Sequence, residues 1–294
     1  MATAGGEKEV AAKVATPLDP TGDGAFLAAL CEATTVLDRL SDWRGAVTGA
    51  STGLVVAQDG SARLVKLQLA ARKIKGEIPD AIGLADAMQV LDLSANEMSG
   101  PLPATIGDCK KLRKLLLMNN EFDGPLPIGI GLLHKLRELY ANNNGFSGGL
   151  PKSIGDCHHL KRLWLCNNEL EGPIPPELGG CASLELLNMS GNQFSGRIPE
   201  ELGNCAKLKH LYLNDNKLDN HLPAGLAYCQ ELVTLELHGN SLSGRFPEEM
   251  LSIATLRRVT LGGNLWPASI QTDAAALREA IPDIHVLFSL DDDD

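Results

Sequence analysis

The sequence has few aromatic residues, no long apolar run and no excess of positive charge, and each absence narrows what the protein can be. Aromatic residues make up only 4% of the 294 residues while 44% are hydrophobic, so the expected core is aliphatic. No stretch approaches about 18 consecutive apolar residues, so no membrane-spanning helix is expected. The net charge of −11 argues against general affinity for nucleic acid or for an anionic membrane surface.

The chain also lacks the sequence signs of secretion and of metal binding. Residues 1–21 contain no apolar run of signal-peptide length, and we expect them to be disordered. The seven cysteines include no C-x-x-C pair and no paired histidine pattern, so neither a metal nor a cofactor is expected. Free thiols in a core are typical of intracellular proteins. We therefore predict a cytoplasmic chain; the alternative is an extracellular one, secreted by another route or cut from a longer chain.

What the sequence has instead is a repeat of 24 residues that keeps its phase through nine units. The units open at Leu64, Met88, Leu112, Leu136, Leu160, Leu184, Leu208, Leu232 and Leu256. Positions one, four and six are apolar, as in a short strand with one buried face, and position nine is Asn in eight units. A fixed period of this length is typical of a solenoid, in which each unit packs only against its neighbours.

The second half of each unit differs in character. Position thirteen is Gly in seven units, and an Ile/Leu–Pro pair follows, such as Ile174-Pro175. Proline restricts the backbone and removes a donor, so we expect the return path to be extended or a short 3-10 turn. Five cysteines share one place in the repeat and are predicted to face the core; a thiol ladder that cross-links or binds metal is the alternative. They are Cys109, Cys157, Cys181, Cys205 and Cys229.

The repeated string L-x-x-L-x-L-x-x-N-x-L-x-G-x-I-P-x-x-L-G resembles the plant-type leucine-rich repeat, a family that includes receptor-kinase ectodomains and polygalacturonase-inhibiting proteins. The resemblance covers about three quarters of the chain. It implies an α/β repeat solenoid, a curved horseshoe with a concave parallel β-sheet and short 3-10 turns on the convex side. The cap is similar to the family's W-x-G-V segment but lacks the paired cysteines of secreted members, which also favours the cytoplasmic prediction.

The expected organisation has four parts. Residues 1–21 lead into an N-terminal cap at 22–63, with a helix over roughly 23–41 and a hairpin from Leu54 to Leu67. Residues 64–279 hold the nine repeats. Residues 280–294 form a closing strand near Ile284 to Phe288 and an acidic tail.

Positions five and seven of each unit point away from the core and are the candidate binding positions. Three of the six Trp and Tyr residues stand at position five, namely Tyr140, Trp164 and Tyr212. This pattern favours an exposed aromatic strip that binds a partner, and cross-strand packing is the alternative. Positions two and three hold nine Lys or Arg against two Glu. That basic lane is consistent either with an acidic partner or with a solvated edge.

Other motifs carry less weight. Residues 49–53 match G-x-S-x-G around Ser51, but a strand-like run follows where a nucleophile elbow needs a helix, so we expect a loop and no enzyme. Asn188-Met189-Ser190 is a glycosylation sequon that we place in a strand, where it matters only after secretion.

We predict a non-enzymatic, monomeric scaffold that binds a protein or peptide through the concave sheet. The alternative is a receptor-like or inhibitor-like extracellular protein that binds a peptide or a cell-wall polysaccharide. The predicted contact residues are Leu116, Met118, Tyr140, Trp164 and Tyr212, with Arg137, Lys161, Arg162 and His210 to orient the partner.

Overall fold

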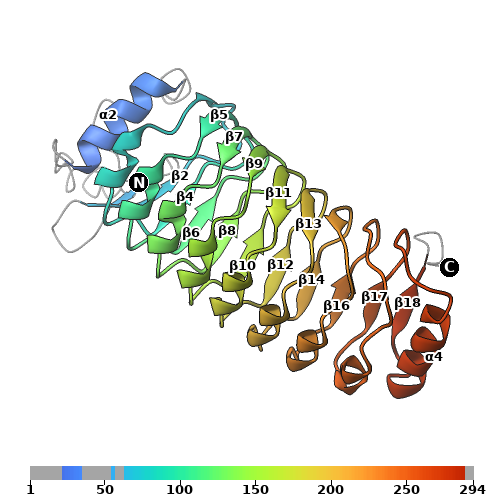
Figure 1. The fold of residues 1–294 in the computed structure, drawn as a ribbon. Coiled ribbons are helices and arrows are strands. Elements are labelled where there is room, and N and C mark those ends of the chain that lie inside the picture. Colours follow the sequence, from blue (N-terminus) through green and yellow to red (C-terminus); the bar gives the residue numbers. More distant parts are fainter. Residues whose placement is uncertain (1–21, 35–53, 57–62, 289–294) are drawn as a thin grey trace, which may run out of the picture.

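Stacked repeats form an elongated solenoid that runs from an N-terminal cap to a C-terminal helix (Figure 1). The computed structural model describes residues 22–34, 54–56 and 63–288. The predicted disorder of residues 1–21, the predicted helix beyond residue 34, the loop around Ser51 and the acidic tail lie outside these residues. Within them, no helix has the length and apolar character that crossing a bilayer requires.

One face of the solenoid is an eleven-stranded sheet in the order β1-β2-β4-β6-β8-β10-β12-β14-β16-β17-β18. β1 pairs with β2 as an antiparallel hairpin, and all later pairs are parallel. The predicted fold, a leucine-rich-repeat solenoid with a parallel sheet, is confirmed. The strands are β1 Leu54–Val56, β2 Leu64–Gln68, β4 Val90–Asp92, β6 Lys114–Leu116, β8 Glu138–Tyr140, β10 Arg162–Trp164, β12 Leu186–Asn188, β14 His210–Tyr212, β16 Thr234–Glu236, β17 Arg258–Thr260 and β18 His285–Leu287.

From β2 to β17 the register of this sheet is one unit of 24 residues per strand. Tyr140 pairs with Trp164, which pairs with Asn188 on the next strand. The leucines at positions one, four and six, such as Leu160, Leu163 and Leu165, are fully buried. The alternation of apolar and outward positions therefore places position five of every unit on the open face of the sheet.

A second sheet, which the sequence did not predict, follows position nine. Its order is β15-β13-β11-β9-β7-β5-β3. Position thirteen has a positive φ in the first eight units, where Gly adopts it easily and Asn220 adopts it in unit seven. The strands are β3 Lys75–Gly76, β5 Glu97–Pro101, β7 Glu121–Pro125, β9 Gly145–Gly148, β11 Glu169–Pro173, β13 Gln193–Gly196 and β15 Lys217–Leu218.

The opposite face consists of eight short 3-10 turns, each starting after a proline, as the Ile/Leu–Pro pairs predict. The five cysteines at one repeat position lie fully buried behind these turns as free thiols. Burial raises the pKa of Cys157 to about 12, so this thiol stays protonated and inert at neutral pH. The turns are η1 Asp80–Leu84, η2 Ala104–Asp108, η3 Ile128–Leu132, η4 Lys152–Asp156, η5 Pro176–Gly180, η6 Glu200–Asn204, η7 Ala224–Tyr228 and η8 Glu248–Ser252.

The two ends are covered by helices α2 (Asp23–Ala33) and α4 (Ile270–Ala280). Each helix contributes one buried aspartate. Its carboxylate accepts hydrogen bonds from an arginine side chain and from the main-chain N–H of the residue that follows this arginine. Asp23 Oδ2 accepts from Arg63 Nε at 2.8 Å and from the Leu64 N–H at 2.7 Å. Asp273 Oδ1 accepts from Arg245 Nη2 at 2.6 Å, and its Oδ2 accepts from the Phe246 N–H at 3.1 Å. These contacts join the caps to the repeats.

Candidate binding surface

One part of the predicted aromatic strip is continuous on the open face of the sheet. Leu116, Tyr140 and Trp164 lie in register on β6, β8 and β10, and all three are partly buried. The ring centroids of Tyr140 and Trp164 are 5.3 Å apart, with 31° between the planes. Met118, two residues beyond Leu116, is partly buried as well. The rings therefore pack against each other, as the cross-strand alternative expects, and still keep exposed surface for a partner.

Two buried polar atoms beside this strip have no hydrogen-bond partner. They are Nε1 of Trp164, a donor, and Oδ1 of Asn142, an acceptor in the preceding unit. An unsatisfied buried polar group costs roughly 1–3 kcal/mol. A folded protein rarely keeps such groups without a reason, so this part of the sheet is distinguished by chemistry as well as by shape.

The rest of the predicted aromatic set lies on the far side of β12. Tyr212 stacks on His210, with centroids 6.2 Å apart, and Asn188 separates the pair from Trp164. Burial, and then the charge of Lys209, lower the pKa of His210. His210 therefore offers a hydrogen-bonding ring and no positive charge near neutral pH.

The basic lane is partly neutralised by acids of the same face. Lys114 Nζ lies 3.0 Å from Glu138, Lys161 Nζ lies 2.7 Å from Glu185, and Lys209 Nζ lies 3.5 Å from Glu231. Side-chain ion pairs of this kind are exposed and weak. Glu138 and Glu185 are the two acids already counted against the nine cations, so of these three acids only Glu231 lowers the net charge further.

Arg162 and Arg137, both predicted to orient the partner, differ in whether their side chains already have partners. Arg162 is held by a hydrogen bond to Tyr140, the main cause that raises the pKa of its guanidinium, and lies 4.0 Å from Glu138. Arg137 is exposed and forms no ion pair with any residue of the described ranges. Of the predicted cations, Arg137 is thus the one whose side chain is available to a partner without breaking an existing contact.

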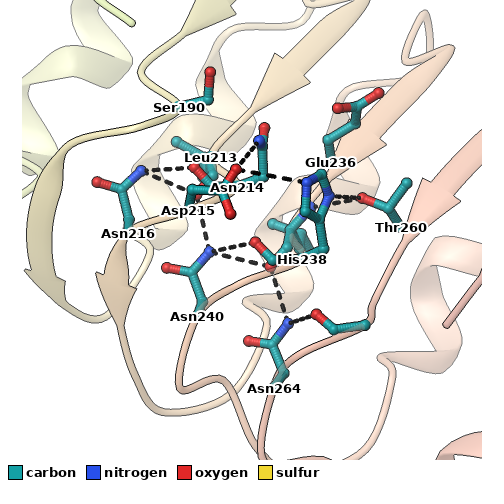
Figure 2. Close-up of polar contacts among 12 residues, drawn as sticks. Ser190, Leu213, Asn214, Asp215, Asn216, Glu236, His238, Asn240, Thr260 and Asn264 are labelled. Atoms are coloured by element: carbon teal, nitrogen blue, oxygen red, sulfur yellow. Dashed lines mark hydrogen bonds and ion pairs between the residues drawn. The ribbon is translucent and has the colours of Figure 1, made fainter. Parts of the chain in front are cut away.

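A hollow at the C-terminal end of the sheet was missed by sequence reasoning. Figure 2 shows the polar contacts of His238, which borders this hollow. It has a volume of about 310 Å³ and is lined by His238, Gly239, Thr260, Gly262, Gly263, Leu287 and Phe288. His238 Nδ1 lies 2.8 Å from Thr260 Oγ1, and its Nε2 lies 3.6 Å from Asp215 Oδ2. Thr260 is 1% exposed, so these contacts orient the imidazole and do not present a nucleophile. In the sequence, the feature that could have indicated this hollow is the set of glycines in the last two units, Gly239, Gly262 and Gly263.

No residue cluster in the described ranges groups three or more metal-ligating side chains. His238 and Asp215 form a pair without a third ligand, and His158 contacts the carbonyl oxygen of Gly180 on the opposite face. The described open face offers aromatic rings, amides and cations to a partner.

Comparison with known proteins gives the family. A family model described as Leucine Rich Repeat matches residues 135–157, 159–181, 183–205 and 207–229. The LRR ectodomain of the plant membrane receptor kinase GASSHO1/SCHENGEN3 from Arabidopsis thaliana, solved in complex with CASPARIAN STRIP INTEGRITY FACTOR 2, is similar. Its TM-score is 0.74 and its identity 32%, over 77% of this chain and 27% of that one. The chain belongs to the leucine-rich-repeat family.

Two further solved structures are similar to this leucine-rich-repeat chain. The ectodomain of the Arabidopsis receptor kinase HAESA, in complex with an N-terminally extended IDA peptide hormone, has a TM-score of 0.70 and 28% identity over 86% of this chain and 43% of that one. A chain of the BIR3–SERK2 complex from Arabidopsis thaliana has a TM-score of 0.50 and 31% identity, and the match covers 58% of this chain and 93% of that one. No curated protein matches the sequence significantly. The chain spans less than half of the GASSHO1/SCHENGEN3 and HAESA ectodomains.

The prediction of a cytoplasmic location is wrong, because the structures that share this fold are ectodomains of plant membrane receptors. The thiol argument failed because the five core cysteines are fully buried, and burial protects a thiol in any compartment. The argument from residues 1–21 has no weight either, since the chain spans only part of the length of these relatives.

Proposed function

We propose that this chain is an extracellular recognition module that binds a peptide or protein segment on the open face of the sheet, with Tyr140 and Trp164 as anchors. The observation that carries the proposal is the half-exposed ring pair beside the unpartnered Nε1 of Trp164. Similar ectodomains, solved with CASPARIAN STRIP INTEGRITY FACTOR 2 and with the IDA peptide hormone, support the class of ligand.

The mechanism is recognition by a preorganised surface. Tyr140 and Trp164 are already packed against each other, so a partner orders few side chains when it covers them. Aromatic anchors that become fully desolvated are the usual hot spots of an interface.

Charge orients the partner in this proposal. Arg137 is exposed and unpaired within the described ranges, and Lys161 and Arg162 border the Tyr140–Trp164 pair. An acidic group in the ligand is steered toward these cations, which affects the association rate and its salt dependence more than the final affinity. Leu116 and Met118 extend the contact on the N-terminal side.

Selection from a displayed peptide library tests the proposal. The wild-type chain is the bait, and the enriched peptides are then offered to a Tyr140→Ala, Trp164→Ala variant. The matched control is Tyr228→Ala, which removes a tyrosine that is 75% exposed on the opposite face. We expect binding to be lost in the double variant and kept in the control. Peptides that bind all three proteins equally would place the site elsewhere.

A further inference from the structure

The sequence contains a single N-x-S/T sequon, Asn188-Met189-Ser190. Asn188 is the last residue of β12, and Met189 and Ser190 follow the strand, so only the first residue of the sequon is in the sheet. Met189 is fully buried while Asn188 is partly exposed on the open face. The strand therefore presents the asparagine side chain outward, on the proposed binding surface.

The two ends of the Asn188 carboxamide have different environments. Oδ1 accepts from the Ser190 N–H at 3.1 Å and from Ser190 Oγ at 2.8 Å. Nδ2 forms no hydrogen bond with the described residues, and it is not among the buried atoms that lack a partner. The oxygen is thus fixed by the sequon's own serine, while the nitrogen is open to solvent.

The same local structure occurs in unit two with an acid. Asp92 Oδ1 accepts from the Ser94 N–H at 3.1 Å and from Ser94 Oγ at 2.6 Å. Asp92 stands at the same repeat position as Asn188 and has no amide nitrogen. The arrangement therefore occurs where Asp or Asn at position five is followed by Ser at position seven. Asn188 differs from Asp92 in having the amide nitrogen to which a glycan can be attached.

We propose that Nδ2 of Asn188 carries an N-linked glycan, an inference that rests on the extracellular location in the proposed function. In the transfer, the anomeric carbon of an oligosaccharyl diphosphate donor forms a bond to Nδ2. The bond from that carbon to the diphosphate oxygen breaks, the diphosphate leaves with the electron pair, and Nδ2 loses one proton. The product is a neutral glycosyl amide that projects from the open face.

The neighbours of Asn188 give this glycan a structural consequence. Trp164 and Tyr212 pair with Asn188 on the two adjacent strands, each about 4.8 Å away. The glycan projects from the strand between these two rings. The glycan then divides the open face into two parts, so that a ligand contacts Leu116, Tyr140 and Trp164 on one side and is kept from Tyr212 on the other.

Glycopeptide mapping of secreted protein tests the modification. The full chain is expressed behind a leader peptide in a eukaryotic host, and its mass is measured before and after digestion with a peptide-N-glycosidase. We expect one glycan on Asn188 in the wild type. Asn188→Asp keeps the oxygen that Ser190 binds, as Asp92 does, and should carry none. Asp92→Asn creates a second sequon at the matched position and should carry two.

Secreted wild-type protein without a glycan would overturn the inference, and a glycan on Asp92→Asn at position 92 would then show that the host enzyme does reach this repeat position. The division of the surface has its own readout. A peptide that binds the unglycosylated Asn188→Asp variant through Tyr212 should bind the glycosylated wild type at least tenfold more weakly, and equal affinities would overturn the division. Failure to select any peptide would count against the proposed function and leave the glycan result standing.

Discussion

At the scale of the residue, the structure depends on the asparagine at position nine. A carboxamide offers two donors and two acceptor sites, and each of these side chains uses both ends on main-chain groups. Asn168 Nδ2 donates to the carbonyl oxygens of Leu165 at 2.9 Å and of Ala141 at 3.0 Å, and its Oδ1 accepts from the Phe146 N–H at 3.1 Å. Two of these three partners belong to the preceding unit. The side chain therefore replaces backbone pairing where the chain leaves the strand.

Replacing Asn168 by alanine should lower the free energy of unfolding by about 2–5 kcal/mol, because several buried main-chain groups lose their partner at roughly 1–3 kcal/mol each. Guanidinium denaturation followed by circular dichroism measures it. The control is Asn167→Gly, since Asn167 is exposed with a φ of 55° that glycine adopts freely. A similar loss in both variants would contradict the role given to position nine.

The sequence was a good guide to single positions and a poor one to side-chain pairing. Position nine, the core leucines and the outward tyrosines could be predicted because the period of 24 fixes which residues are neighbours. The ion pair between Lys209 and Glu231 could not, because Glu231 lies outside the positions counted as the basic lane. The open Nδ2 of Asn188 could not be foreseen either, since it depends on the rotamer that Ser190 holds.

At the scale of the element, the two cap helices use the same device. Asp23 and Asp273 are buried, and each accepts from an arginine and from the next main-chain N–H. The apolar spacing of the sequence predicted the N-terminal cap helix, and it gave no sign of the role of either aspartate. Their role depends on a partner 40 or 28 residues away, which no local pattern reveals.

The cap contact of Asp273 should be pH-dependent. A hydrogen bond from Arg245 lowers the pKa of this carboxyl, so its contribution to stability is present above the ordinary pKa of about 4 and is lost as the pH falls through the folded value. Asp273→Asn should therefore lower the free energy of unfolding by about 1–3 kcal/mol at pH 7, and the difference from wild type should shrink on acidification. Asp283→Asn is the exposed control. A difference that stays constant with pH would exclude this mechanism.

The 3-10 turns also depend on close contact between elements. A Cβ on Gly155 in η4 would overlap the carbonyl oxygen of Glu177 in η5. Gly155→Ala should therefore cost about 1–3 kcal/mol by forcing the turns apart. On Gly149 the nearest atom, the carbonyl oxygen of Glu171, is 3.8 Å away, so Gly149→Ala should change stability by less than about 0.5 kcal/mol. Thermal unfolding of both variants measures the contrast, and equal stability would show that the turns are free to separate.

At the scale of the whole molecule, the repeat produces a long sheet whose open face changes character along its length. Leu116, Tyr140 and Trp164 form an apolar cluster, and a hollow bordered by His238, Leu287 and Phe288 lies near the C-terminal end. A solenoid holds such positions at fixed spacing, because each unit is packed on both sides by its neighbours. The architecture could be predicted from the repeat alone. The cellular location of the protein could not be predicted from the cysteines, because buried thiols carry no information about the compartment.

The most direct test of the account is the affinity of one selected peptide for the Trp164→Ala variant, measured by titration calorimetry beside the wild type and Tyr228→Ala. If Trp164 anchors the partner, its loss should weaken binding at least tenfold, about 1.4 kcal/mol or more, while Tyr228→Ala leaves the affinity unchanged. Equal affinities for the wild type and Trp164→Ala would contradict the claim that the partner is held at the Tyr140–Trp164 pair.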